Sequence, residues 1–448
     1  MKTSYLSRLL PAFIGGLTSF YVSNGLAANI APSQQPPAGI AINNAPQFVA
    51  IAFDDNTLVD GQKWVLEQWG QRQNPSGTHN PATYDGTAIH TTFFNTCEAI
   101  LINPEQENNA GHVKETWYQA SLLGHEMANH TLNHLHGLEF SYQQWQEQIG
   151  ECQKTMNQPF TQVDPEFPND NEGIDAHAVG FRAPYLEYND TMLQYLQAQG
   201  FKYDASIVEG YDPAHHGGNQ YWPYTLNDGS PGADLSTSWG IKPPISQHAG
   251  LWEIPVYAFI VPDDETAKQY GIHHSIRDKI AAEMSWFDVQ SGKIESGDYN
   301  LFYMAKLSGP EVLAIMKYNL DLRLAGNRAP LTFLGHSTQY DDNFDLWVPT
   351  ESTAAERRKA IEDFLDYALS KPDVRIVSHI ELVNWLENPT ALPKTCTSHS
   401  WQGNQAYQAG QKVSFNGFEW QANWWSFNEE PSAGSWQAWT QLDACRSE

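Results

Sequence analysis

The sequence predicts an α/β barrel followed by a small, disulfide-closed all-β module. From about residue 45 to residue 387, strand-like and helix-like segments alternate, which is typical of a parallel sheet wrapped by helices. The first strand, Phe48–Phe53, is an unbroken apolar run of the kind buried in parallel sheets. Beyond the barrel, six Trp lie between Cys396 and Cys445. That span is too short for an ordinary core, so a closing disulfide is expected there.

Further strands and helices follow from the same two patterns. Short apolar runs bounded by polar turns predict strands at 88–94, 176–181, 201–204, 252–261, 330–334 and 374–378. Apolar residues at helical spacing predict helices at 58–71, 113–123, 140–156, 191–200, 311–319, 353–370 and 380–386. The stretch 208–245 is rich in Gly, Pro, His and Tyr and is expected to be loop-like.

The chain divides into four parts. Residues 1–28 have a basic start, an interrupted apolar stretch and small residues before a cleavage point, which predicts a secretory signal peptide. The main domain covers 29–387, a linker 388–395, and the terminal module 396–448. Since later residues contain no run of about 18 apolar residues, no membrane span is expected, and the mature protein is predicted to be secreted.

Export makes disulfides the expected state of the four cysteines. Four cysteines allow three pairings. We favour Cys97 with Cys152 and Cys396 with Cys445, because each pair then lies within one inferred domain.

Composition narrows the partners. The formal charge is −27, from 52 acidic and 25 basic residues. Such a chain repels phosphate backbones and anionic membranes, whereas a neutral polymer or a cationic product is compatible with it. The 16 Trp and 20 Tyr mildly favour a carbohydrate ligand, since sugars are bound by flat rings beside hydrogen-bonding groups. No feature indicates a protein partner.

Two short motifs carry the candidate chemistry. Asp54 and Asp55 end the first strand, where α/β barrels place their reactive groups. His130 and His134 stand four residues apart, and a helix from about Asn129 would place both rings on one face, within reach of one metal ion. Each motif alone is weak, because paired aspartates also serve in turns and a histidine pair at this spacing arises by chance.

The two motifs together are more informative. One carboxylate and two imidazoles form a metal-binding set that leaves positions open for water and substrate. The second carboxylate can then act as a base toward that water.

The residues also carry a family resemblance. FDD at 53–55, HTLNH at 130–134, RAPY at 182–185 and a late His336 resemble the polysaccharide deacetylases of carbohydrate esterase family 4, over about residues 45–390. RAPYLE, WPYTL at 222–226 and NRAP at 327–330 resemble the chitin deacetylase branch. The resemblance implies a distorted (β/α) barrel of the polysaccharide deacetylase type and metal-dependent removal of N-acetyl groups.

By this resemblance, Asp55, His130 and His134 bind Zn²⁺, with other divalent metals also compatible. Asp54 is implied as the general base for the attacking water, and Arg182 as the partner that keeps Asp54 ionised and oriented.

The resemblance assigns three further roles. The backbone N–H of Tyr185 is expected to face the oxyanion, and His336 to protonate the leaving amine. Trp222 and Tyr224, in a polar stretch, are expected to form a platform for the acetyl group or the sugar.

This chain departs from the family pattern in two places. Asn56-Thr57 follows FDD where the family usually has Gly-Pro. The acidic motif that normally raises the pKa of the acid histidine is not recognisable, and Asp204, Asp263 and Asp264 remain the candidates.

The terminal module has its own resemblance. Its aromatic and glycine pattern between the two cysteines resembles the chitin-binding modules of carbohydrate-binding family 5/12. By that resemblance, Trp424 and Trp425 form the sugar-stacking platform, with Trp401 as a third contact.

The sequence therefore predicts a secreted, zinc-dependent deacetylase of chitin or N-acetylglucosamine (GlcNAc) oligosaccharides, with a chitin-binding module. Two alternatives remain: a deacetylase of another polymer, such as peptidoglycan or acetylxylan, and a non-catalytic chitin-binding protein.

Overall fold

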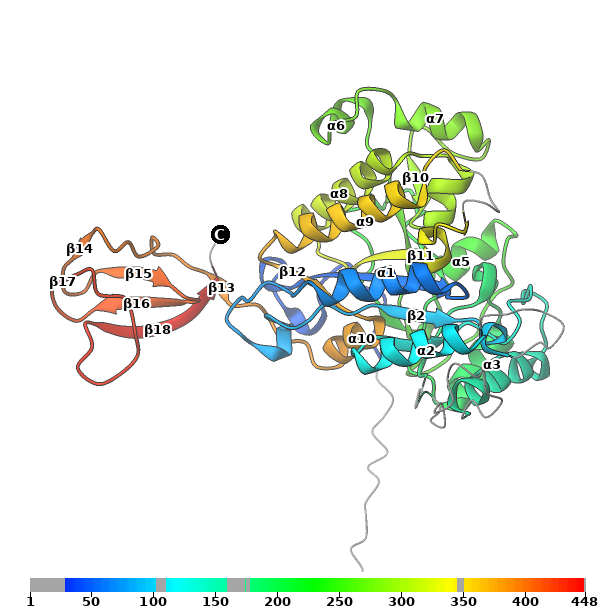
Figure 1. Cartoon of the computed structure of the whole chain (residues 1–448), viewed down its shortest axis with the longest axis horizontal. Coiled ribbons are helices and arrows are strands. Elements are labelled where there is room, and N and C mark those ends of the chain that lie inside the picture. The colour runs from blue at the N-terminus through cyan, green and yellow to red at the C-terminus, as the bar shows by residue number, and fades with distance from the viewer. Residues whose placement is uncertain (1–28, 102–109, 159–173, 175–177, 345–349, 447–448) are drawn as a thin grey trace, which may run out of the picture.

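The computed structural model describes residues 29–101, 110–158, 174, 178–344 and 350–446. It consists of a large α/β part and a small β module at one end (Figure 1). The predicted fold class is confirmed. The predicted signal peptide, 1–28, lies outside the described residues.

The sheet is built around β1 (Gln47–Asp55), whose apolar run is fully buried, as predicted. It pairs in parallel with β11 (Leu331–His336), with β2 (Thr92–Asn95) along its second half and with β12 (Val374–Ile376) along its first residues. Because β1 has neighbouring strands on both edges, its backbone N–H and C=O groups can form hydrogen bonds within the sheet.

The sheet then curls away from β1. After β2 come β3 (Glu126–Asn129), β4 (Gly180–Phe181), β5 (Tyr203–Asp204), β8 (Trp252–Glu253) and the antiparallel β7 (Tyr224–Thr225). A second sheet contains, in spatial order, β10 (Lys293–Glu295), β9 (Val256–Ile260) and β6 (Val208–Glu209). A β-bridge between Gly297 and Leu334 connects the segment after β10 to β11. The result is the distorted barrel.

Helices surround this sheet (Figure 1). Seven are found where the sequence predicts them: α1 (Val59–Gly70), α2 (Ala110–Leu122), α3 (Tyr142–Asn157), α4 (Asp190–Gln199), α8 (Gly309–Ala325), α9 (Ala354–Leu369) and α10 (His379–Glu387). Side-chain caps define several starts: Ser141, Thr353 and Ser378 each close a capping box. Among the described residues, no helix is both long and apolar enough to cross a membrane.

Three helices were not predicted: α5 (Pro231–Ser238), α6 (Asp264–Gln269) and α7 (Ile276–Glu283). Each is short, and α5 lies within the stretch expected to be loop-like. A helix of two turns offers too few apolar positions for a periodic signal.

Both favoured disulfides are present. Cys97–Cys152 ties the turn after β2 to α3, and Cys396–Cys445 joins the two ends of the terminal module. The favoured pairing of the four cysteines is confirmed.

The terminal module is all-β, as predicted. Its strands are β13 (Lys394–Thr395), β14 (Ala406–Tyr407), β15 (Lys412–Phe415), β16 (Phe418–Ala422), β17 (Ser426–Phe427) and β18 (Trp439–Arg446). Its small core is aromatic and includes Tyr407, Trp420 and Trp439. Because β13 pairs with β18, the sheet starts two residues inside the stretch predicted as a linker.

The module is attached beside the amino-terminal ends of the barrel strands. Arg446 Nε lies 2.9 Å from Asp373 Oδ1, just before β12, and the N–H of Leu392 donates to the carbonyl of Asn44, just before β1. The candidate chemistry lies at the opposite, carboxyl ends of these strands.

Candidate active site

A candidate metal site is formed by Asp55, His130 and His134, whose ligand atoms all lie within 4.8 Å of one another. Asp55 Oδ1 is 3.3 Å from His134 Nε2 and 3.7 Å from His130 Nε2. Strand register explains the convergence. Asp55 ends β1 opposite Asn95, and Asn95 pairs with Asn129, the residue before His130.

The two histidines do not lie on a helix, so that expectation is wrong. Residues 126–129 form β3, and the chain then turns, with Thr131 and His134 in left-handed conformations at φ of 71° and 50°. The turn is held by local bonds: the Asn129 side chain accepts from the Thr131 N–H at 2.9 Å, and Thr131 Oγ1 accepts from the His134 N–H at 3.1 Å.

The donor set fits a divalent metal that prefers nitrogen and oxygen ligands, such as zinc. His130 Nδ1 lies 2.8 Å from the carbonyl oxygen of Arg182, so a proton there leaves Nε2 unprotonated toward Asp55. Burial lowers the pKa of His130 to about 4 despite nearby Asp54, which keeps the ring neutral at physiological pH. The His-carbonyl contact also fixes the ring orientation.

Asp54 is held by Arg182, as predicted. Arg182 Nη1 donates to Asp54 Oδ1 at 2.7 Å, and both side chains are buried. Arg182 Nε donates to the carbonyl of Ala205, and the guanidinium lies 4.2 Å from the centre of the Phe94 ring. On the far side, Arg182 Nη2 lies 3.5 Å from His379 Nε2. A guanidinium fixed on several sides holds the carboxylate in one orientation.

His336 stands beside Asp54, because the two residues are direct partners in the β1–β11 register. Its Nδ1 is 2.7 Å from Asp298 Oδ1, and its backbone N–H donates to Asp298 Oδ2 at 2.7 Å. Burial disfavours the charged ring, but Asp298 and then Asp55 and Asp54 outweigh it and raise the pKa of His336 to about 9. The ring is therefore protonated at neutral pH, as a general acid requires.

Asp298 corrects the expectation that Asp204, Asp263 or Asp264 would pair with His336. Asp204 is buried against Ser206, whereas Asp263 caps α6 and Asp264 begins that helix. Asp298 immediately precedes the π-helical turn Tyr299–Met304, after β10. Nothing in the local pattern marks it as functional, so only the three-dimensional structure could identify it.

Asp54, Asp55, His130, His134 and His336 line one pocket of about 460 Å³. Arg182 and Asp298 are not among its lining residues but bond to Asp54 and His336. Tyr185 lies on the pocket wall in a left-handed conformation, with φ of 56°, and its half-exposed ring stacks on His136 at 3.9 Å. Sequence reasoning missed Glu295 and Asn300, which also line the pocket; the side-chain amide of Asn300 donates to Glu295 at 2.7 Å. Both residues lie close to Asp298 in the chain, in a stretch whose sequence contains no motif that indicates function.

Trp222 and Tyr224 are not part of this pocket, so their predicted role as a substrate platform is wrong. Trp222 is 2% exposed and stacks on Trp385 at 5.9 Å, and Tyr224 is fully buried with its hydroxyl 2.7 Å from Glu209. Both residues lie beside or within β7, which packs into the core, and not in an open polar loop.

Asn56 stands directly after FDD, where the family that the sequence resembles usually has Gly, and its conformation suits this position. Its backbone is left-handed, with φ of 56°, which Asn adopts more readily than most residues. Its buried amide donates to the carbonyls of Phe53 and Phe94, so it ties β1 to β2 directly after the two aspartates.

The three module tryptophans that were predicted to contact sugar lie in two different environments. Trp424 and Trp425 are adjacent and exposed, at 44% and 58%. Trp401 is partly buried and meets Phe415 edge-on at 5.3 Å.

Comparison with known proteins finds similarity to one family of enzymes. Residues 42–203 match the polysaccharide deacetylase family, and this region contains six of the predicted site residues: Asp54, Asp55, His130, His134, Arg182 and Tyr185. This part of the chain is therefore similar to a polysaccharide deacetylase domain.

Individual relatives are distant. Chitin deacetylase 8 of Bombyx mori is 22% identical over 364 residues, which cover 80% of this chain and 75% of that protein. A structure described as a polysaccharide deacetylase from Mycobacterium smegmatis is 13% identical with a TM-score of 0.46, covering 83% of this chain and 100% of that one. The chitin deacetylase of Colletotrichum lindemuthianum is 18% identical with a TM-score of 0.25, covering 40% of this chain and 62% of that one.

The Asp298–His336 pair gives a prediction about pH. In Asp298→Asn the carboxylate that raises the pKa of His336 is lost, so the ring loses its proton at lower pH. A general acid works only below its pKa, so we expect activity to decline as pH rises through about 9. A divalent cation adds positive charge nearby and would move this decline to a somewhat lower pH. In Asp298→Asn this decline should move to lower pH, and kcat should fall about tenfold or more.

The measurement is a pH–rate profile of acetate release from a GlcNAc oligomer. Asp342→Asn, which changes an exposed acid beyond β11, serves as the matched control. An Asp298→Asn profile that superimposes on the wild-type profile would contradict the assigned role.

Proposed function

We propose that this protein is a secreted, metal-dependent deacetylase of chitin or GlcNAc oligosaccharides, which releases acetate and leaves glucosamine units. The observation that supports it most is the shared pocket, where the Asp55–His130–His134 cluster lies beside both the Asp54–Arg182 and His336–Asp298 pairs. These are the parts that amide hydrolysis needs: a metal site, a base and an acid.

In this proposal Asp55, His130 and His134 hold one Zn²⁺. When bound, such an ion acts as a Lewis acid that polarises the acetamide carbonyl and makes a nearby water easier to deprotonate. The donors of this chain are suited to it, since His130 is neutral and oriented. Burial alone would raise the pKa of Asp55, but the protonated His336 and the hydrogen bond from Thr96 help to lower it overall.

Asp54 takes the proton from the water that attacks the acetyl carbonyl. Arg182 supports this role because its bond to Oδ1 leaves Oδ2 directed toward the metal site, where it lies 4.0 Å from His130 Nε2. The backbone N–H of Tyr185, on the pocket wall, is proposed to donate to the developing oxyanion.

His336 completes the reaction by giving its proton to the leaving nitrogen. The carbon–nitrogen bond then breaks, and the products are acetate and a free amine. Asp298, bound to Nδ1, leaves Nε2 as the nitrogen that faces the pocket and donates.

Three observations support chitin as the substrate. One distant relative is named a chitin deacetylase, the module carries the adjacent exposed Trp424 and Trp425, and a net charge of −27 is compatible with a neutral polymer and a cationic product. The two disulfides and the predicted leader at 1–28 agree with secretion.

The substrate is tested by acetate release from equal amounts of GlcNAc oligomers, peptidoglycan and acetylxylan. We expect the highest kcat/KM on the GlcNAc oligomers, because both halves of the chain are assigned to the same sugar. Equal rates on all three would reject the chitin assignment, and no release from any would favour the non-catalytic alternative.

The module gives a separate prediction. It is attached at the amino-terminal ends of the barrel strands, and the nine-residue β1 alone separates it from the pocket by about 30 Å at roughly 3.3 Å per residue. We therefore expect Trp424→Ala/Trp425→Ala to reduce binding to solid chitin strongly, while kcat on soluble tetrasaccharide stays within about twofold.

Pull-down on chitin beads and soluble-substrate kinetics measure the two effects. Trp286→Ala, an exposed Trp of the main domain, is the control. Undiminished bead binding would show that these rings are not the platform.

A further inference from the structure

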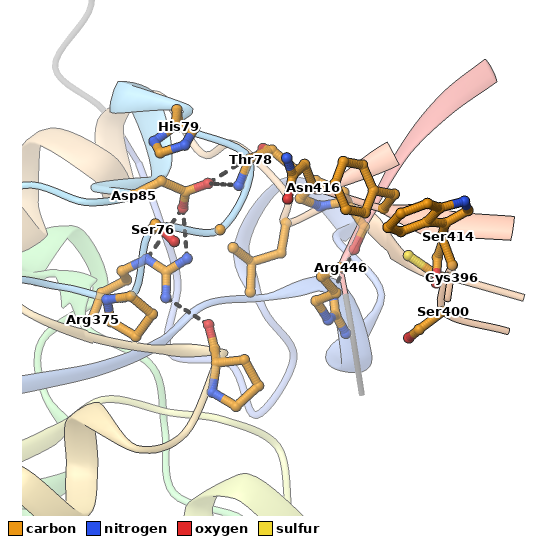
Figure 2. Close-up of a pocket in the computed structure, with 18 residues that line it drawn as sticks. Ser76, Thr78, His79, Asp85, Arg375, Cys396, Ser400, Ser414, Asn416 and Arg446 are labelled. Atoms are coloured by element: carbon orange, nitrogen blue, oxygen red, sulfur yellow. Dashed lines mark hydrogen bonds and ion pairs between the residues drawn. The ribbon is translucent and has the colours of Figure 1, made fainter. Parts of the chain in front are cut away.

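A second pocket, of about 660 Å³, lies where the terminal module meets the barrel. Figure 2 shows Ser76, Thr78 and His79 of a barrel loop on one side, and Ser400, Ser414 and Asn416 of the module on the other. It shares no lining residue with the active-site pocket and lies at the amino-terminal ends of the strands. Its volume is within the range of small-ligand sites.

The charged side chains on its walls already have bonding partners within the protein. Arg375 Nη2 bonds to Asp85 Oδ1 at 2.6 Å, with both groups buried, and Arg446 Nε lies 2.9 Å from Asp373 Oδ1. Arg446 shares Asp373 with Arg328, and its Nη1 and Nη2 donate to the carbonyls of Pro393 and Asn43. Because these charged groups are engaged, the walls favour an uncharged, hydrogen-bonding ligand.

The remaining lining combines uncharged hydrogen-bonding groups with aromatic rings. Ser76, Thr78, Ser400 and Asn416 line the same pocket as the aromatic residues Trp401 and Phe415. Sugars present the matching surface, since their hydroxyl and acetamide groups bond to such polar groups while their C–H faces pack on rings.

The barrel side of the pocket is held in a fixed shape. Asp85 Oδ2 accepts from the backbone N–H of Thr78 at 2.8 Å, and Asp85 Oδ1 accepts from Thr83 Oγ1 at 2.8 Å. The loop passes so close that a Cβ at Gly77 would lie 2.3 Å from Asp85 Oδ2. A loop ordered before binding loses little entropy when a ligand is bound.

We propose that this junction pocket is a second saccharide-binding site, which takes a segment of neutral GlcNAc oligosaccharide between the module and the barrel. This inference rests on the proposed function for the identity of the sugar. A chain bound here contacts both domains at the end of the molecule away from the active site. The segment that is bound is therefore not the segment that is deacetylated.

The test uses hydrogen exchange on the full-length Asp54→Asn protein, which is not expected to consume the ligand. The probe is GlcNAc tetrasaccharide at saturating concentration. We expect slower exchange in peptides covering 76–80 and 412–417, in addition to peptides of the active-site pocket. Unchanged exchange in both junction peptides would overturn the proposal.

A blocking variant provides the second measurement. Ser76 is exposed, so Ser76→Trp fills the pocket without removing a buried contact, and Ser76→Ala is its matched control. In a Trp424→Ala/Trp425→Ala background, we expect Ser76→Trp to weaken the junction site by about tenfold or more, seen as loss of junction protection, while Ser76→Ala retains it. Full protection in Ser76→Trp would contradict the assignment.

The outcome is separable from that of the proposed function. Acetate release by the wild-type chain tests deacetylation independently of the junction peptides. Release without junction protection would reject this second site alone. Junction protection without any release would retain the saccharide site and reject the enzyme assignment.

Discussion

The parallel pairing of β1 with β11 and β2 is the constraint on which the site depends. In parallel strands the carboxyl ends lie at one edge of the sheet, so residues far apart in the chain meet there. The register places Asp54 opposite His336 and Asp55 opposite Asn95, next to the strand that leads to His130. A shift of one residue in β1 would turn Asp54 away from the face that it occupies now and break its register with His336.

The same edge holds its ionisable groups in different protonation states. Arg182 pairs with Asp54, burial keeps His130 neutral, and Asp298 raises the pKa of His336 so that its ring is protonated. The base, metal-ligand and acid roles proposed for these three groups are therefore compatible within one pocket, because each group has its own partner. The buried Asp54–Arg182 pair also avoids the cost of an uncompensated charge inside the barrel.

The sequence was most informative where local chemistry decides the structure. The apolar run before Asp54 predicted a buried strand, and the spacing of the four cysteines within two domains predicted both disulfides. Predictions failed where distant parts of the chain decide. The turn of His130 and His134 is held by the side chain of Asn129 and does not follow helical periodicity. Trp222 is buried in a cluster that includes Trp385, which lies far along the chain. Asp298 was missed because its function exists only through contact with His336.

The central claim is that Asp55, His130 and His134 hold one divalent cation. Asp54 does not bind this cation but acts as the base for the attacking water. The most direct test measures bound zinc and acetate release together, for wild-type protein, Asp54→Asn and Asp55→Asn. The account predicts about one zinc per chain in wild type and Asp54→Asn, turnover only in wild type, and loss of both zinc and turnover in Asp55→Asn. An Asp55→Asn protein that keeps its zinc and its activity would contradict it.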